Sequence, residues 1–297
     1  MNTPDLAELL PSWGMHLAAE NRSAQTVESY TIGVRLFLTW CQRQERPAVL
    51  DRASVNAFVA GLLASGAEPA TARARHQALR RFSAWLTDEE EIDRDELLSL
   101  KPPKLDVKVV PRLSEDQCRA LVKACAGKEF IDRRDEALVR FMVETGVRAG
   151  EVIAMGRTDM DAVAGAAVVR RGKGGKGRQV PFGPQTGRAI DRYLRLRRAH
   201  PLAGDSALWL GGGGQRFAYH GLRVALRRRA ELAGIEAFTP HVLRHTAASR
   251  WLSAGGSEGG LMAVAGWSRR DMLDRYVADT ASERATAEAR RLGLGDL

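Results

Sequence analysis

The sequence predicts a mainly α protein of two domains, with a small antiparallel sheet in the second domain. Three observations lead to this prediction. Apolar residues recur at helical spacing along most of the chain, a proline-rich segment near residue 101 interrupts them, and two short β-prone segments flank a glycine-rich turn. A chain of 297 residues is long enough for two cores of ordinary size.

The first domain is expected to be helical. Apolar side chains at spacings of three and four predict helices over residues 6–17, 27–41, 55–63 and 69–86. Ser23 stands where a cap of the second helix is expected. On the last helix Arg73, His76 and Arg80 share a face that is separate from the apolar face, so they are candidates for contact with an anionic partner.

A linker is predicted over residues 101–112. This segment contains three prolines and has no amphipathic period, which favours extended backbone. We therefore assign residues 1–100 to the first domain and residues 113–297 to the second.

The second domain opens with a capping-box pattern at residues 114–117, which predicts a helix to about residue 126. Another helix is predicted over about 132–145, because Gly146 suits a helix end. Strands are expected at 166–170 and 178–182, joined by a turn at 172–177; the remainder should be helical apart from a short strand at 208–210 and a glycine loop at 211–214. Glycine weakens a helix by about 1 kcal/mol relative to alanine. The glycine pairs at 255–256 and 259–260 therefore predict an irregular segment.

The distribution of charge favours an anionic partner. The chain has a net charge of +9. Residues 1–100 contain ten arginines, no lysine and 14 acidic residues, for a net charge of −4, and residues 101–297 carry +13. Nucleic acid is the commonest polyanion that such a basic protein binds.

The sequence argues against a membrane or secreted protein. No apolar run has the length of a membrane span, and residues 1–10 lack the basic segment that opens a signal peptide. Cys41, Cys118 and Cys125 form no recognisable metal or disulfide pattern. We therefore expect a reducing, cytoplasmic setting.

Two local patterns place basic side chains where they can meet an anion. In the Thr-Gly-x-Arg-x-x-Glu box at residues 145–151, glycines on both sides allow the backbone to hold Arg148 close to a ligand. In the His-x-x-Arg-His box, the spacing puts His241, Arg244 and His245 on one helical face. Two histidines four residues apart can ligate zinc, but no third ligand is evident, so we expect no metal.

A third pattern contains a tyrosine. Gly266 and Trp267 are followed, nine residues after the tryptophan, by Tyr276 in a basic amphipathic segment. Taken alone, Tyr276 has the surroundings of a packing residue.

The chain resembles the tyrosine recombinase, or phage integrase, family in the order of its motifs: Arg148, Lys173 in the glycine-rich turn, His241-x-x-Arg244, Gly266-Trp267 and Tyr276. The resemblance covers nearly the whole chain. It implies a helical core-binding domain and a catalytic domain of helices with a small antiparallel sheet, which together form a C-shaped clamp on DNA. One position departs from the usual pattern, because Trp267 stands where the family usually has a second histidine.

The resemblance implies a site-specific recombinase that cleaves and rejoins DNA through a 3′-phosphotyrosyl intermediate. Tyr276 would be the nucleophile, and Arg148 and Arg244 would bind the scissile phosphate. By the same resemblance Lys173 protonates the departing 5′ oxygen, with Lys176 as the competing candidate. The covalent link stores the bond energy, so no cofactor is expected.

Two further catalytic roles are expected. His241 would accept the tyrosine proton or share the charge. Trp267 would position and stabilise the phosphate, because an indole N–H donates a hydrogen bond but cannot transfer a proton. Glu151 is expected to hold Arg148 or a backbone group in place.

Contacts to DNA are predicted in both domains and are expected to weaken steeply with salt. The predicted DNA-binding residues are Arg73, His76, Arg80, Lys176 and Arg178. The resemblance also implies double-stranded attachment-site DNA as the partner, a homotetramer on two duplexes and a possible accessory directionality factor. Residues 282–297 are expected to form a short helix that, by analogy, docks on a neighbouring subunit.

Several roles stay open. The chain begins with the core-binding helices and so is expected to lack an arm-binding domain. Trp267 replaces a histidine that Xer-type resolvases usually keep, which favours integration or excision of a phage or mobile element. The alternatives are an Xer-like or transposon recombinase, a type IB topoisomerase, and an inactive DNA-binding regulator. The separate core-binding domain argues against the topoisomerase, and the six filled catalytic positions argue against the regulator.

Overall fold

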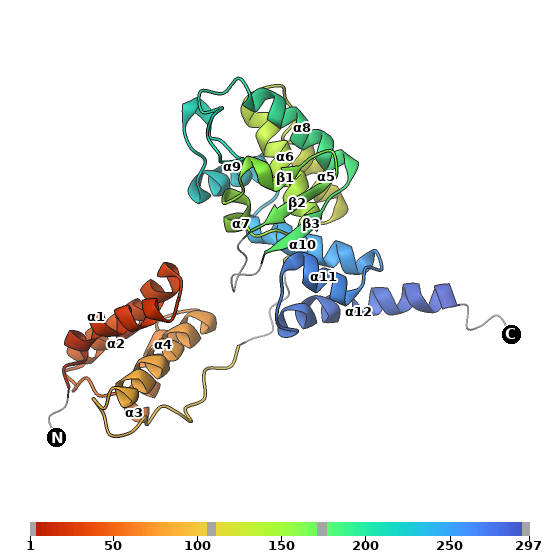
Figure 1. Cartoon of the computed structure of the whole chain (residues 1–297). Helices are drawn as coiled ribbons and strands as arrows, with labels where there is room; N and C mark the ends of the chain where they lie inside the picture. Colours follow the sequence, from red (N-terminus) through yellow and green to blue (C-terminus); the bar gives the residue numbers. More distant parts are fainter. Residues whose placement is uncertain (1–3, 106–110, 171–176, 293–297) are drawn as a thin grey trace. The chain divides into compact units, whose positions relative to one another are not determined.

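The computed structural model describes residues 4–105, 111–170 and 177–292, shown as a cartoon in Figure 1. The chain divides into two compact units, residues 1–108 and 109–297. The described residues are mostly helical and contain one three-stranded antiparallel sheet, as the sequence predicts. In this part of the chain no helix combines the length and the apolar character of a membrane span.

Over its described residues, 4–105, the first unit is built from four helices: α1 (Leu6–Ala19), α2 (Ala24–Arg43), α3 (Arg52–Ala64) and α4 (Pro69–Asp88). The Ser23 side chain caps α2 by accepting a hydrogen bond from the Thr26 amide, as predicted. Aromatic side chains fill the core. The rings of Trp13 and Phe82 lie 4.9 Å apart, centre to centre, so α1 and α4 are held together across it.

The predicted DNA-binding face of α4 is largely absent from the surface. His76 is buried, with 1% of its surface exposed, because both α2 and α3 pack against α4. Arg80 donates hydrogen bonds to the carbonyl oxygens of Leu97 and Leu98, at 3.1 and 2.6 Å. Of the three predicted residues only Arg73 is exposed. The prediction is therefore wrong for His76 as a phosphate contact, and Arg80 instead fixes the segment that follows α4.

The second unit surrounds one central helix. Helix α6 contacts α5, α8, α9 and α10, and its buried residues Leu138, Phe141 and Met142 belong to the main core. The helices of this unit are α5 (Glu115–Lys123), α6 (Phe130–Thr145), α7 (Ala149–Ile153), α8 (Pro184–Arg197), α9 (Tyr219–Leu232), α10 (Pro240–Ser253), α11 (Glu258–Ala265) and α12 (Asp271–Leu292), with short 3₁₀ turns η1 (Arg157–Asp159) and η2 (Gly212–Gly214). The capping box predicted at the start of α5 is present, with Ser114 and Gln117 bonded reciprocally.

The sheet has the order β1-β2-β3, with β1 at Met160–Asp161, β2 at Ala166–Val169 and β3 at Arg178–Pro181. The last two strands confirm the predicted pair, each ending one residue early. They pair antiparallel, with Ala166 opposite Pro181 and Val169 opposite Arg178. The turn between them holds Lys173 and Lys176, both of which lie outside the described residues.

One local prediction for this unit is wrong, and a second is confirmed only in part. Residues 208–210 make only isolated bridges, because the Leu208 amide bonds to the Met155 carbonyl oxygen and the Leu210 amide to the Tyr193 hydroxyl. The irregular backbone predicted from the two glycine pairs is present at residues 255–256, where Gly255 has φ of +81°, but residues 258–265 form α11 despite their glycines. Ser257 caps this helix by accepting from the Gly260 amide, and Leu261 and Ala265 are buried. Capping and burial thus outweigh the low helix propensity of glycine.

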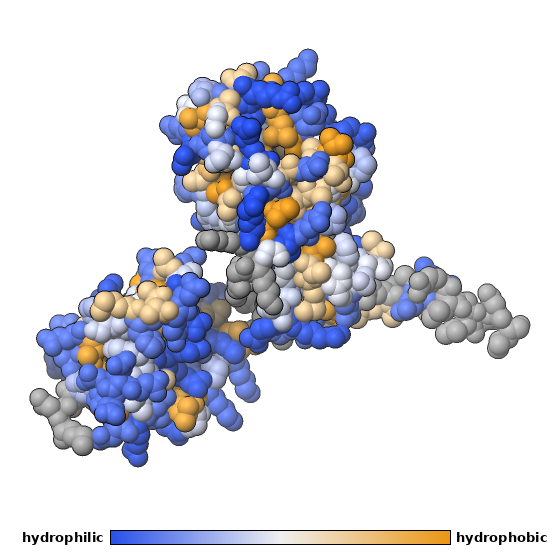
Figure 2. Space-filling view, in the orientation of Figure 1, coloured by the Kyte–Doolittle hydropathy of each residue, from blue (hydrophilic) through white to orange (hydrophobic). Residues whose placement is uncertain are grey.

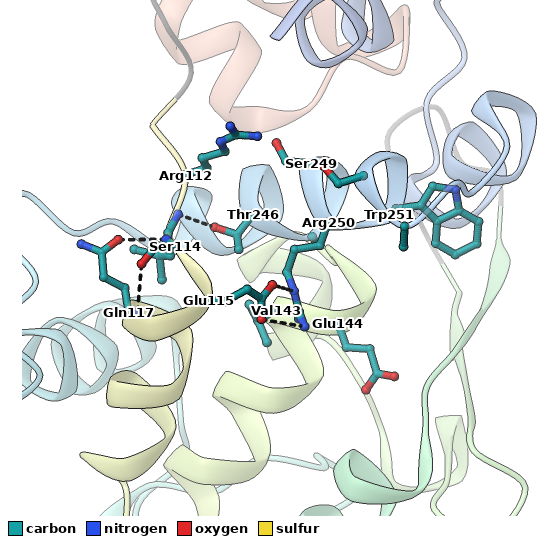
Figure 3. A pocket seen from close by; sticks show the side chains of 14 residues that line it. Arg112, Ser114, Glu115, Gln117, Val143, Glu144, Thr246, Ser249, Arg250 and Trp251 are labelled. Atoms are coloured by element: carbon teal, nitrogen blue, oxygen red, sulfur yellow. Dashed lines mark hydrogen bonds and ion pairs between the residues drawn. The ribbon is translucent and has the colours of Figure 1, made fainter. Parts of the chain in front are cut away.

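Helix α10 has two faces with different surroundings. His241, Arg244 and His245 lie on one face, and Thr246, Arg250 and Ser253 on the other. The second face borders a cavity of about 830 Å³ together with the start of α5 and the end of α6 (Figure 3). Arg250 pairs with Glu115 across this cavity, at 2.7 Å. The cavity therefore lies behind the helix that carries the basic box.

One buried hydrogen bond ties α10 to the end of the linker. The Leu113 amide donates to Thr246 Oγ1 at 2.9 Å, and the Thr246 hydroxyl donates to the Val242 carbonyl oxygen. Thr246 is fully buried and Leu113 is 7% exposed. Water therefore cannot readily replace this partner of the Leu113 amide.

We predict that Thr246→Val destabilises the second unit by about 1–3 kcal/mol, because it leaves a buried N–H without an acceptor while keeping the side-chain volume. Urea unfolding followed by fluorescence measures the change. Thr246→Ser is the control, since it keeps the hydroxyl. Equal unfolding midpoints for Thr246→Val and the wild type would contradict the importance of this bond.

Candidate active site

The end of α6 brings the first basic residue to the site. Gly146 ends the helix in the left-handed conformation, with φ of +64°, as predicted from the sequence. A Cβ atom there would lie 3.2 Å from Cβ of Ala247, so glycine also allows α6 to approach α10 closely. Arg148 follows in extended backbone as the residue that precedes α7.

Glu151 is the acceptor that organises this corner. Its carboxylate accepts hydrogen bonds from the Arg148 amide and from Arg148 Nη1, at 2.9 and 2.8 Å. It also accepts from Nη1 and Nη2 of Arg178, at 3.0 and 2.7 Å. This confirms the expectation that Glu151 holds Arg148 in place, and it adds a second arginine to the group.

Burial alone would raise the pKa of the Glu151 carboxyl, but the hydrogen bonds from Arg178 and from the Arg148 amide outweigh it. The net pKa is lowered below its ordinary value, so Glu151 is ionised at neutral pH. Its stabilising contribution is present above the ordinary pKa of 4.5 and is lost as the pH falls through the lowered value.

Arg178 does not lie where a DNA contact was predicted. Its side chain is only 10% exposed, and its N–H groups donate hydrogen bonds within the protein. Besides the two bonds to Glu151, Nε donates to the Val264 carbonyl oxygen at 2.7 Å. The guanidinium also fills the space beside Gly266, where a Cβ atom would lie 2.9–3.1 Å from it. Arg178 therefore links β3 to the segment that precedes Trp267.

Arg244 forms the second basic corner. It is 3% exposed, and its guanidinium donates to the carbonyl oxygens of Gly146 and Ala265, at 2.6 and 2.8 Å. Burial and the nearby positive charge of Arg148 lower the pKa of Arg244 to about 10, which still leaves it protonated at neutral pH. Arg244 also lies over the Trp267 ring, with Cζ 5.2 Å from the ring centre.

Tyr276 is packed against Trp267. The rings of Trp267 and Tyr276 stack with centres 5.1 Å apart and planes 15° apart. Tyr276 is 2% exposed and Trp267 is 6% exposed, and both belong to a small core that is separate from the main one. The stack fixes the direction of the tyrosine ring.

The histidine bonded to the tyrosine is not the one expected. Nδ1 of His245 and the Tyr276 hydroxyl share a hydrogen bond, and the two rings lie 5.4 Å apart. His241 packs edge-on against His245 at 4.5 Å, one turn further toward the start of α10. Both histidines occupy the predicted face, and His245 is the one that contacts the Tyr276 hydroxyl. His245 therefore joins His241 as a candidate for the proton acceptor.

The electrostatics of the site suit a bound anion. Desolvation by the surrounding atoms, followed by the positive charges of Arg244 and Arg148, lowers the pKa of His241. Among the described residues Trp267 Nε1 is buried and has no acceptor. An anion between these groups would accept from the indole N–H and balance the arginine charges.

The structure thus brings together Arg148, His241, Arg244, Trp267 and Tyr276, which stand far apart in the sequence. Lys173, the sixth predicted residue, lies outside the described residues. Two members of the site were missed. His245 had a signal, since it shares a helical face with Arg244. Arg178 had none, because nothing in its local sequence indicates a carboxylate 27 positions earlier.

Comparisons with known proteins agree with this geometry. The model of the Phage integrase family matches residues 111–283, and that of the phage integrase N-terminal SAM-like domain matches residues 11–90. The tyrosine recombinase XerC of Rhodospirillum centenum is 31% identical, over 98% of this chain and 90% of that protein.

Two solved structures share the fold. The Tn1549 transposon integrase in complex with a circular intermediate DNA has a TM-score of 0.75 at 15% identity, covering 96% of this chain and 99% of that chain. The lambda integrase tetramer bound to a Holliday junction has a TM-score of 0.70 at 17% identity, covering 93% of this chain and 78% of that chain.

We predict that Gly266→Ala is more damaging than Gly255→Ala. Both glycines have positive φ, +65° and +81°, but only a Cβ at Gly266 meets another group, the Arg178 guanidinium. Each variant therefore loses about 1 kcal/mol to backbone strain. Gly266→Ala in addition displaces the Arg178 side chain from the space beside Gly266. Thermal unfolding of the two variants measures the difference, and equal losses would show that the Arg178 contact is unimportant.

Proposed function

The chain belongs to the tyrosine recombinase, or phage integrase, family, and on that premise we propose that Tyr276 cleaves one DNA strand to form a 3′-phosphotyrosyl link. As a family member it is a site-specific recombinase, an enzyme of DNA strand cleavage and transfer. The observation that supports our assignment most is the contact of the Tyr276 hydroxyl with His245 beside two arginines.

In this mechanism the scissile phosphate occupies the space between Arg148 and Arg244. Their fixed positive charges stabilise the added negative charge as phosphorus becomes five-coordinate. Trp267 Nε1 supplies a neutral donor for a phosphate oxygen. Both arginines are held in advance by protein acceptors, Glu151 and the carbonyl oxygens of Gly146 and Ala265, so little reorganisation is needed.

Proton transfer accompanies the attack. In the tautomer with its proton on Nε2, His245 accepts the Tyr276 proton at Nδ1 while the tyrosine oxygen bonds to phosphorus. The bond from phosphorus to the 5′ oxygen breaks, and that oxygen takes a proton from Lys173, the donor that the family resemblance implies. In rejoining, the 5′ hydroxyl of a partner strand gives its proton to Lys173 and its oxygen bonds to phosphorus. The bond from phosphorus to the tyrosine oxygen breaks, and that oxygen recovers its proton from His245, which reseals the DNA.

Strand exchange between two duplexes requires several active sites. The lambda integrase named above is a tetramer on a Holliday junction, and we propose the same homotetramer for this chain on two copies of a double-stranded site. Whether an accessory directionality factor takes part stays a prediction from the resemblance.

The role in the cell is a choice between two proposals. Trp267 favours integration of a phage or mobile element, whereas the match to a protein named XerC along 98% of the chain favours an Xer-like role in the chromosome. We propose the Xer-like role, because it is supported along the whole chain and the other rests on one residue. Deletion of the gene should then leave unresolved chromosome dimers; normal segregation together with loss of prophage integration would favour the phage role.

We predict that Tyr276→Phe abolishes covalent capture of DNA. The variant keeps the ring and its stack on Trp267 but lacks the attacking oxygen. A pool of nicked duplexes from the encoding genome is incubated with protein, denatured in detergent and assayed for protein-linked DNA. The wild type should be captured and the variant should not. Tyr219→Phe is the control, since Tyr219 is 54% exposed at the start of α9, and it should be captured normally.

We predict that His245→Ala slows capture about 10²-fold or more at neutral pH, the usual effect of losing a general base. Its rate should rise as the pH is raised, because an unassisted tyrosine loses its proton only near pH 10. His241→Ala is the matched comparison on the same face and should show less of this alkaline recovery. A stronger recovery in His241→Ala would return the proton acceptor role to His241.

A further inference from the structure

A second basic site lies on the surface of the second unit. A cavity of about 470 Å³ opens between the end of α5, the loop that follows it, α6 and α8. In the view of Figure 2 the surface over α8 carries hydrophilic residues with apolar ones among them. The charged residues that line the cavity are Lys123, Lys128, Arg133, Arg140, Arg192 and Glu136.

Glu136 holds three of these cations in fixed positions. Its Oε1 accepts from Arg140 Nε at 3.0 Å and from Arg192 Nη2 at 2.9 Å, and its Oε2 accepts from Arg133 Nη1 at 3.4 Å. The carboxylate is buried, with 9% of its side chain exposed, whereas the three arginine side chains are 23–39% exposed. The carboxylate lies beneath the guanidiniums, which keep donors at the surface.

The charges in this cavity do not balance. Five cations surround one carboxylate, which leaves an excess of about four positive charges in a concave site. Two acids nearby on α6 do not reduce it, because Asp132 and Asp135 both pair with Arg229, at 2.8 and 2.9 Å. Among the described residues Arg192 Nε is also buried and has no acceptor. An anion would lower the repulsion among the guanidiniums.

The cavity is separate from the active site. Glu136 stands nine residues before Thr145, which places it about 14 Å along α6 from the helix end that carries Arg148. None of its lining residues contributes to the group around Tyr276. A phosphate bound here cannot be the one that is cleaved.

We propose that this cavity binds backbone phosphates of duplex DNA outside the exchange site, a second DNA contact of the catalytic unit. Arginines held in place match the oxygens of a phosphodiester in two-point contacts, and Lys123 and Lys128 add mobile point charges at the rim. The inference rests on the proposed function in taking duplex DNA as the anion. DNA that continues past the exchange site, or a second duplex in a synapse, carries such phosphates.

The test uses Lys123→Gln with Lys128→Gln in the full chain. Both lysines are exposed and neither belongs to the Glu136 group, so the fold is preserved. Fluorescence anisotropy measures binding to a long duplex of random sequence between about 50 and 200 mM salt. Each lost phosphate contact lowers the slope of log affinity against log salt by about 0.9, so the double variant should lose nearly two.

A control pair removes the same charge elsewhere. Arg94 and Arg216 each have side chains that are 81% exposed and lie outside the cavity, and Arg94→Gln with Arg216→Gln should keep the wild-type slope. A third variant, Arg192→Gln, tests the held guanidiniums and should lower the slope by about 0.9. An unchanged slope in the lysine pair, or an equal loss in the control pair, would overturn the proposal.

Two further outcomes separate other ligands and the active site. If inorganic phosphate, at matched ionic strength, raises the thermal midpoint of the wild type but not of Arg192→Gln while DNA slopes are equal, the cavity binds a free anion and the DNA proposal is wrong. Covalent capture by Tyr276 is measured in parallel. If the wild type captures no DNA covalently but the lysine pair still has a lower slope of log affinity against log salt, the recombinase mechanism is contradicted and DNA binding at this cavity is supported.

Discussion

The arrangement of the site depends on the buried carboxylate of Glu151. It accepts four hydrogen bonds from two arginines that belong to different parts of the chain, Arg148 beside α7 and Arg178 in β3. A buried carboxylate without such partners is costly, and two arginines without it would repel. This one acceptor therefore brings the end of α6 and the sheet to fixed positions.

The same network of contacts extends to Tyr276. Arg178 continues from Glu151 to the Val264 carbonyl oxygen and fills the space beside Gly266, which precedes Trp267. Trp267 in turn stacks on Tyr276. Trp267 thus orients the tyrosine ring, and among the described residues its buried indole N–H has no acceptor, while His245 contacts the tyrosine oxygen.

The sequence predicted the helices, the two main strands and five candidate site residues that the structure brings together, because amphipathic periods and motif spacing are local. It failed where the deciding contact is distant. His76 was predicted to lie at the surface, but α2 and α3 pack against α4 and bury it. Arg178 was predicted to contact DNA, but its side chain is paired with Glu151. The glycine pairs before Trp267 predicted irregular backbone, which is present at residues 255–256, but burial of Leu261 and a serine cap stabilise a helix over the second pair.

The central claim is that Tyr276 is the residue joined to DNA, through a 3′ phosphate. The most direct measurement digests a trapped complex with nuclease and protease and sequences the nucleotide-bearing peptide by mass spectrometry. The account predicts a nucleotide on Tyr276, linked through its 3′ phosphate, and a free 5′ hydroxyl on the other DNA end. A nucleotide on Tyr30, Tyr193 or Tyr219, or a 5′ linkage, would contradict it.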